Sequence, residues 1–318
     1  MNLFAPSYYP AFRCIAGDCQ HSCCIGWEID IDPRTLARYR ALPPRERKEI
    51  LSHTVTQKGC TSFRLCKDER CPFLNADGLC RLILAHGEEI LCDICREHPR
   101  FYQTYSDRTE VGLGLCCEEA ARLILTDPHP FALICIKEDS SMSDPVADPF
   151  EAIFLSQRAE DLRTITDRTR PLSHRINDLL ERHSLSPAAI FSNDSHWQAV
   201  YRSFEQLDPA WSDALTAWEN TPGLQNLPDS VEAEQLIAYF FYRHLASARE
   251  DGGYPVRVAF ALLSAHVICR IAAAIRPHHL PTLIDTARAY SAEIEYDEDN
   301  VLKLLETLEQ TGVVLPTA

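Results

Sequence analysis

From residue 150 onward, apolar side chains recur at helical spacing almost without interruption. The clearest stretch is 231–250, where Val231, Leu236, Ile237 and Phe240 share one face and glycines follow at 252–253. Apolar positions three and four residues apart line one side of a helix. The same spacing predicts further helices over 150–165, 172–183, 186–206, 209–219, 254–275, 281–293 and 297–311. We expect an α-helical bundle with the aromatic run 239–242 in its core.

The N-terminal half has a different pattern, made of short elements joined by loops. Asp32 stands before an apolar periodicity that predicts a helix over 33–42, with Asp32 as its cap. Residues 60–66 alternate between polar and apolar in the manner of a strand, and 118–125 is helical. The sequence therefore predicts a mainly α protein whose N-terminal half is cysteine-rich and laced by loops, with short helices and a small hairpin.

An AspGly pair at 77–78 predicts a tight turn. Such a turn would bring Cys71 and Cys80 together across that small hairpin. Further along, 137–150 is polar and carries two prolines, as linkers do. The predicted organisation is a cysteine-rich metal or iron–sulfur-binding domain over 1–136, a linker over 137–150 and an α-helical domain over 151–318.

Twelve of the 14 cysteines lie within the first 117 residues. The other two, Cys135 and Cys269, have apolar neighbours and are expected to be inert, buried thiols. A disulfide framework is disfavoured for two reasons. A chain of 318 residues can bury a hydrophobic core without disulfide bonds. The sequence also shows no basic start followed by an apolar run, the pattern of a signal peptide. We therefore expect a cytoplasmic protein with reduced thiols that bind a soft metal.

The spacing of the thiols does not by itself determine which metal they bind. Zinc sites usually contain paired C-x2-C knuckles, and only Cys92 and Cys95 have that spacing. Thiolates that hold an iron–sulfur cluster tolerate irregular spacing better. The sequence therefore favours an iron–sulfur cluster, with zinc as the alternative.

The overall charge indicates which classes of binding partner the protein favours. With 31 basic and 46 acidic residues, the formal net charge is −15, which disfavours sequence-independent binding of nucleic acid. No apolar stretch is expected to reach membrane-spanning length, since 258–275 is interrupted by polar residues. An acidic surface favours a lysine-rich partner. The phosphate-binding GxxxxGK[ST], zinc-protease HExxH and hydrolase GxSxG motifs are absent from the sequence.

Several segments together carry a family resemblance. They are TyrTyr-x2-Phe-x-Cys at 8–14, CysCys-x2-TrpGluIleAspIleAsp at 23–32, CysProPheLeu-x-x-AspGlyLeuCysArgLeu at 71–82, CysArgGluHisProArg at 95–100, and 110–123. In these segments the chain resembles the flagellin lysine N-methylase family. The cysteine pattern is also similar to that of small zinc- or iron-chelating domains.

The resemblance implies methyl transfer from S-adenosylmethionine to lysine ε-amines of flagellin by a protein with an iron–sulfur cluster of the four-iron type. The cysteines that match the family's motifs number eight, more than the four that one cluster needs. Either a subset binds the cluster or a second metal is present. The eight are Cys14, Cys19, Cys23, Cys24, Cys71, Cys80, Cys95 and Cys117. Cys60, Cys66, Cys92 and Cys116 are additions to the pattern.

Five residues within or beside these motifs are candidates for other roles. Lysine must lose its proton before it attacks the methyl group, and Glu110, Tyr9 and Tyr102 are candidate bases. Arg96 and Arg100 are candidates for binding an anionic group of the donor, with surface salt bridges as the alternative. The competing function is a non-catalytic zinc or iron–sulfur chelator or carrier.

Overall fold

The computed structural model describes residues 1–138, 148–192, 194–221 and 227–316. The chain forms two compact units. The cysteine unit comprises 13–101 and 117–119, and the helical unit comprises 1–12, 102–116 and 120–318. The segment 102–136 is thus placed mostly in the helical unit, whereas the predicted boundary at 136 assigns it to the cysteine-rich domain. Residues 139–147 of the predicted linker lie outside the described ranges.

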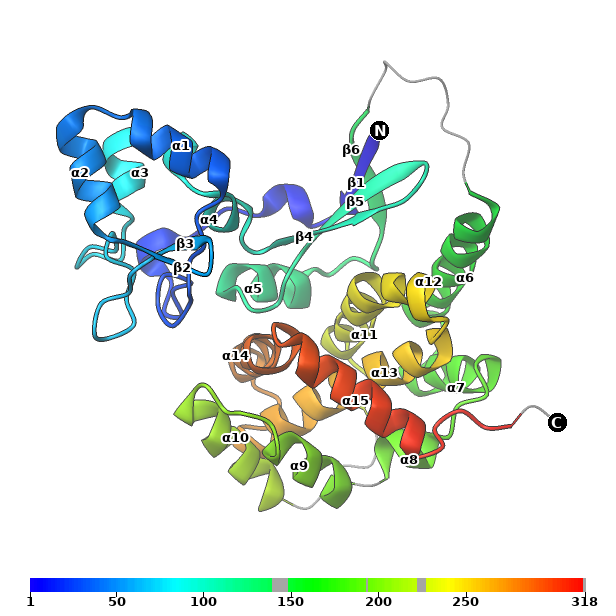
Figure 1. Ribbon diagram of the computed structural model, residues 1–318. Helices are drawn as coiled ribbons and strands as arrows, with labels where there is room; N and C mark the ends of the chain where they lie inside the picture. The colour runs from blue at the N-terminus through cyan, green and yellow to red at the C-terminus, as the bar shows by residue number, and fades with distance from the viewer. Residues whose placement is uncertain (139–147, 193, 222–226, 317–318) are drawn as a thin grey trace. The chain divides into compact units, whose positions relative to one another are not determined.

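The cysteine unit is built from short elements. Its helices are η2 (Ala16–Asp18), α1 (Pro33–Ala41), α2 (Pro44–Ser52), α3 (Arg81–His86), η3 (Glu88–Ile90) and α4 (Asp93–Glu97), and an antiparallel hairpin joins β2 (Thr54–Gln57) to β3 (Cys60–Phe63) (Figure 1). The predicted helix over 33–42 is confirmed as α1. The side chain of Asp32 caps it by accepting the backbone N–H of Thr35 at 2.8 Å.

The helical unit contains a four-stranded sheet that the sequence analysis did not predict. Its strand order is β4-β5-β1-β6, with β1 (Asn2–Pro6) parallel to β5 (Arg108–Leu113) and antiparallel to β6 (Leu133–Lys137). Strand β4 (Arg100–Thr104) enters this unit at Tyr102. The prediction of a mainly α protein holds, but the part of the chain before residue 138 contains more strand than the predicted small hairpin.

The predicted helices of the C-terminal half are confirmed with small shifts. They are α6 (Pro149–Thr166), α7 (Leu172–Arg182), α10 (Pro209–Glu219), α13 (Tyr254–Ile275) and α15 (Glu298–Gln310) (Figure 1). Three predicted segments are interrupted: 186–206 gives α8 (Pro187–Phe191) and α9 (Asp194–Arg202); 231–250 gives α11 (Val231–His244), η4 (Leu245–Ser247) and α12 (Ala248–Asp251); and 281–293 gives α14 (Leu280–Tyr290) and the π-helix η5 (Ser291–Glu295). The predicted helix over 118–125 is α5 (Glu118–Thr126).

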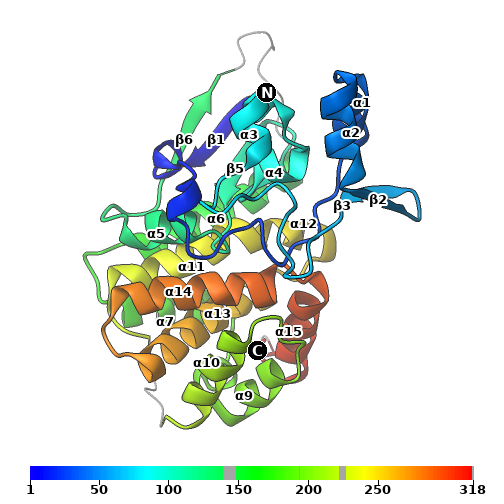
Figure 2. The same ribbon diagram turned by 90° about the vertical axis from the view of Figure 1, so that its left-hand side faces the viewer.

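Helix α13 is the central element of the helical unit. It packs against α10, α11, α14 and α15 (Figure 2). By length and composition it is apolar enough to cross a membrane, contrary to the sequence expectation, yet 78% of its most apolar window is buried in the protein. Burial of this kind is what a core helix of a globular unit requires.

Helix α11 connects this bundle to the sheet. The aromatic run 239–242 is almost fully buried, which confirms its assignment to the core. The hydroxyl of Tyr242 donates to the carbonyl of Val111 on β5 at 3.1 Å, and the amide of Gln103 on β4 donates to the carbonyl of Tyr242 at 3.0 Å. These hydrogen bonds satisfy the buried hydroxyl and carbonyl groups of Tyr242.

Candidate metal centre

All eight motif cysteines belong to the cysteine unit. The CysCys pair at 116–117 is divided, because Cys116 belongs to the helical unit and Cys117 to the cysteine unit. In the helical unit, hydrogen bonding to Cys116 is one of the causes that raise the pKa of Tyr296, after burial. The structure therefore groups Cys117, which the family motif favours, with the other motif cysteines.

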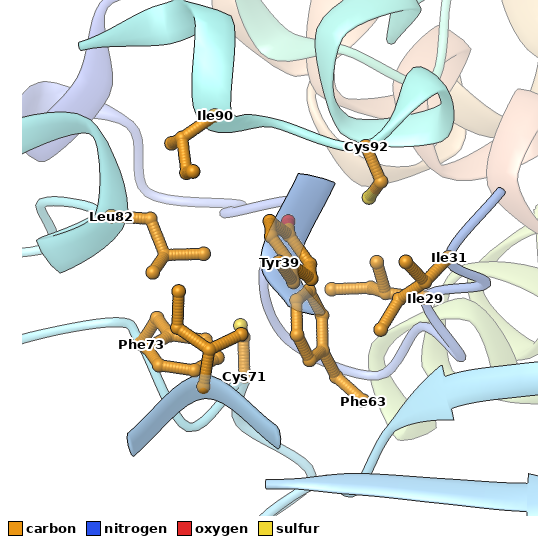
Figure 3. Close-up of a cluster of buried hydrophobic side chains, with 10 residues drawn as sticks. Ile29, Ile31, Tyr39, Phe63, Cys71, Phe73, Leu82, Ile90 and Cys92 are labelled. Atoms are coloured by element: carbon orange, nitrogen blue, oxygen red, sulfur yellow. The ribbon is translucent and has the colours of Figure 1, made fainter. Parts of the chain in front are cut away.

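One set of thiols packs into the apolar core of the cysteine unit. Cys71 and Cys92 are part of this core, 7% and 1% exposed, and lie among Tyr39, Phe63 and Phe73 (Figure 3). Three half-buried cysteines pack against the same core. We call this set the core group, and it consists of Cys24, Cys71, Cys80, Cys92 and Cys95.

Backbone hydrogen bonds hold the core group together from segments far apart in the sequence. The N–H of Cys71 donates to the carbonyl of Cys24 at 2.8 Å, which joins the first motif to the third. Leu74 and Cys80 form an isolated antiparallel bridge around the turn at Gly78, whose φ of 74° suits glycine. The predicted turn at 77–78 is confirmed, although it closes a single bridge and no longer hairpin.

The protonation of the core group reflects both burial and the neighbouring thiols. Burial raises the pKa of Cys71 to about 11, and Cys24, Cys80 and Cys92 contribute to this shift. A hydrogen bond with Cys23 lowers the pKa of Cys24 to about 7, and one with Cys95 lowers the pKa of Cys92. The same hydrogen bonds raise the pKa of Cys23 and Cys95, so in each pair one thiol keeps its proton while the other favours the thiolate form that binds metal.

A second set of thiols lies outside the apolar core. Cys14 and Cys23 are exposed, and Cys19 and Cys117 are half-buried. The pKa of Cys23 is raised first by its hydrogen bond with Cys24 and by desolvation of its sulfur atom, and then by the charges of Cys24, Cys14 and Cys117. We call this set, Cys14, Cys19, Cys23 and Cys117, the open group.

Glu118 links two segments of the open group. Its carboxylate accepts the backbone N–H groups of Gln20 at 2.9 Å and His21 at 3.2 Å, and the thiol of Cys19 at 3.6 Å. Burial and then this carboxylate raise the pKa of Cys19 to about 11, against a lowering by the backbone of His21. Glu118 therefore holds the loop that follows Cys19 beside its own neighbour, Cys117. The sequence analysis did not identify this role.

Thiols are suitable ligands for the expected metal, but they are not arranged as a complete coordination sphere. Thiolates are the usual ligands of both iron–sulfur clusters and structural zinc. Among the described residues, no three or more His, Cys, Asp or Glu side chains are arranged to hold a metal ion. Occupation of either group therefore requires the thiol side chains to turn toward a common centre.

The two candidate donor-binding arginines already have partners within the cysteine unit. Arg96 pairs with Asp93 and, at 3.4 Å, with Glu97. Nη1 of Arg100 donates to the carbonyl of Arg96 at 3.4 Å. These contacts correspond to the salt-bridge alternative for Arg96, and the role of both residues in donor binding stays a prediction.

The three candidate bases lie in the helical unit. Glu110 on β5 is 0% exposed, and both its oxygens accept from Nη2 of Arg158 on α6 at 2.7 and 2.8 Å. Tyr102 on β4 is 51% exposed, and Tyr9 begins the short helix η1 (Tyr9–Ala11) and is half-buried. Glu110 thus has a structural partner that the sequence did not indicate, while the catalytic roles of the three residues stay predictions.

The cysteines outside the two groups differ in burial. Cys60 and Cys66 are exposed. Cys269 is buried on α13, as expected, and burial raises the pKa of its thiol to about 12. The prediction for Cys135 is wrong, because this residue is exposed on β6. Strand β6 lies at the edge of the sheet, and the apolar neighbour Ile134 is exposed there as well.

Three relatives resemble part of this chain. The Flagellar biosynthetic protein FliU of Salmonella muenchen is 29% identical over 139 residues, which cover 40% of this chain and 79% of that protein. Lysine-N-methylases of Salmonella typhimurium and Salmonella choleraesuis are also 29% identical over 139 residues, and the match covers 33% of their length. These relatives support the flagellin lysine N-methylase family. The chain thus matches about a third of the length of the two lysine-N-methylases. No family model and no solved structure matches it.

Proposed function

We propose that this protein is a lysine N-methyltransferase that moves a methyl group from S-adenosylmethionine to lysine ε-amines of flagellin. The observation that carries the proposal is the similarity to the lysine-N-methylases of Salmonella. The relative FliU, which is named as a flagellar biosynthetic protein, supports flagellin as the substrate. The clustered thiols support the iron–sulfur cluster that the resemblance implies.

The chain's residues have separate tasks in this proposal. The motif cysteines hold a four-iron cluster, which, when bound, offers a Lewis-acidic iron. Arg96 and Arg100 bind an anionic group of the donor. Glu110, Tyr9 or Tyr102 takes the proton from the incoming lysine, because only the neutral amine attacks a methyl group in line with the carbon–sulfur bond.

Charge and thiol content support the proposed setting. A net charge of −15 attracts a lysine-bearing protein and repels nucleic acid. Twelve cysteines within 117 residues need a reducing compartment to stay available for metal. We therefore place the protein in the cytoplasm, with flagellin and S-adenosylmethionine as partners and no nucleic acid or membrane.

The test is transfer of a labelled methyl group. Anaerobically purified protein, labelled S-adenosylmethionine and flagellin should give label in lysine after hydrolysis of the flagellin. The variant C23S/C24S should lose both the brown colour and the transfer, whereas C60S/C66S, which changes two exposed cysteines outside both groups, should keep them. Full transfer by C23S/C24S would remove these cysteines from the mechanism.

A non-catalytic chelator or carrier is the second candidate. It is favoured by the limited match, which covers 79% of FliU but only 33% of each lysine-N-methylase. In that case the protein carries iron or zinc, which a chelator removes, and flagellin stays unlabelled whether metal is present or absent. The labelling experiment separates the two functions.

A further inference from the structure

The core of the cysteine unit contains a buried hydroxyl group that lacks a partner. Tyr39 on α1 is 0% exposed, and its hydroxyl oxygen has no hydrogen-bond partner among the described residues. Such a group has lost its hydrogen bonds to water and gained none in return, so native proteins rarely keep one. Phenylalanine would fill the same space without this cost. A tyrosine at this position therefore indicates a partner that the polypeptide alone does not supply.

The packing of Tyr39 places its hydroxyl near the thiols of the core group. Its ring packs against that of Phe63, with ring centroids 6.2 Å apart. Figure 3 shows the hydroxyl on the side of the core where Ile90 and Cys92 lie. Cys92 belongs to the same buried cluster as Tyr39, and Cys95 packs against this cluster. The unpartnered hydroxyl and the C-x2-C pair thus share one apolar environment.

The charges of these thiols also act on the hydroxyl. Burial raises the pKa of Tyr39, and the charges of Cys92, Cys95 and Cys80 contribute to the same shift. A tyrosine that keeps its proton is a hydrogen-bond donor. Cysteines lose their protons when they bind metal, and the resulting thiolates are stronger acceptors than neutral thiols. A donor without a partner therefore lies among sulfur atoms that become acceptors in the metal-bound protein.

We propose that Tyr39 is a positioning residue of the metal centre, whose hydroxyl donates a hydrogen bond to a metal-bound thiolate of the pair Cys92 and Cys95. The bond forms when the thiols turn toward the metal, so the hydroxyl gains its partner only in the metal-bound protein. Partners of this kind orient the ligands and increase metal affinity. The inference rests on the metal of the proposed function, holds for an iron–sulfur cluster and for zinc, and is independent of methyl transfer.

The test compares Y39F with the wild-type full chain, purified anaerobically and then treated with a chelator. In competition with the chelator, Y39F should bind its metal about 10- to 100-fold more weakly than the wild-type protein. After the metal is removed, Y39F should unfold at the same urea concentration as the wild-type protein or at a higher one, because the substitution removes only an unpartnered hydroxyl. The effect of the substitution should therefore depend on the metal.

A matched control removes a buried hydroxyl that has a protein partner. The hydroxyls of Tyr201 and Tyr290 in the helical unit are hydrogen-bonded at 2.9 Å. Y201F should destabilise the protein equally with and without metal and leave metal affinity unchanged. Where the metal is an iron–sulfur cluster, Y39F should also shift its reduction potential to a more negative value, since a hydrogen bond to sulfur stabilises the more negative reduced state.

Three results would overturn the inference. Metal binding by Y39F as tight as that of the wild-type protein would show that the hydroxyl does not support the ligands. An equal loss of stability in Y39F with and without metal would show that Tyr39 contributes to packing alone. A wild-type chain that binds neither iron nor zinc would remove the acceptor that the inference requires. Methylation of flagellin is not measured here, so failure of the methyltransferase proposal stays distinguishable.

Discussion

Glu118 accepts the backbone N–H of Gln20 across 98 positions of sequence, at 2.9 Å. The same oxygen accepts from His21 and from the thiol of Cys19. Since Cys117 precedes Glu118 in the chain, this carboxylate fixes the separation between the first motif and the last. The geometry of the open group thus depends on a residue that is not itself a cysteine.

Replacing Glu118 should loosen the loop at 19–21 and weaken metal binding by the open group. In E118A two backbone N–H groups lose their acceptor, and the loop at 19–21 is released from Cys117. We expect less iron and sulfide per chain. E118Q keeps one acceptor oxygen and should retain more iron than E118A. Equal iron in E118A and wild-type protein would show that the clamp is not needed for cluster binding.

The ion pair between Glu110 and Arg158 makes it possible to distinguish a structural role of Glu110 from a catalytic one. Both side chains are buried, 0% and 3% exposed, so E110Q leaves a buried guanidinium without its counter-charge. We expect a loss of about 3–5 kcal/mol in the free energy of unfolding, measured by urea denaturation. The control E219Q breaks the half-exposed pair of Glu219 and Arg202 and should cost about 0–1 kcal/mol.

The outcome for E110Q also tests Glu110 as the base. If Glu110 takes the proton from lysine, E110Q loses methyl transfer even at a temperature where the variant is fully folded. If its role is structural, transfer by the folded variant stays near the wild-type rate. A stable but inactive E110Q would contradict the structural account given by the Arg158 contact.

Asp32 connects the starts of two helices. Its oxygens accept the backbone N–H of Thr35 at 2.8 Å and of Asp93 at 3.0 Å. Burial alone would raise the pKa of Asp32, but these two hydrogen bonds outweigh it and lower the pKa to about 2. A carboxyl whose folded pKa lies below its unfolded value stabilises the protein above the unfolded pKa.

The stability that Asp32 contributes should therefore be present above about pH 4 and be lost as the pH falls toward 2. D32A should lower the free energy of unfolding near neutral pH by about 1–2 kcal/mol, the usual cost of losing a helix cap. The difference between wild-type and D32A protein should shrink as the pH falls from 4 to 2. A difference that stays constant over this range would show that the charged form of Asp32 is not what stabilises the caps.

The helices were predictable because their signals are local. The apolar periodicity and the cap at Asp32 lie within the segments that they specify, and α1, α6, α10, α13 and α15 follow them closely. The sheet was not predictable in this way, since β1 pairs with β5 more than a hundred residues later. Such pairing depends on tertiary contacts that no local pattern encodes.

The arrangement of the cysteines could likewise be predicted only in part from the sequence. Spacing identified the motif thiols, and the turn at 77–78 indicated that Cys71 and Cys80 lie close together. Spacing could not show that Cys24 is half-buried while its neighbour Cys23 is exposed, because burial depends on what packs against each residue. The contribution of Glu118 was likewise hidden, since its partners lie 97 to 99 positions away in the sequence.

The most direct test of the proposed function is the intact mass of flagellin after incubation with the anaerobically purified protein and S-adenosylmethionine. The account predicts a rise in steps of about 14 Da, one for each methyl group, which map to lysine and are absent when the donor is omitted. Unchanged flagellin mass with a protein that contains its full complement of iron and sulfide would contradict the methyltransferase proposal.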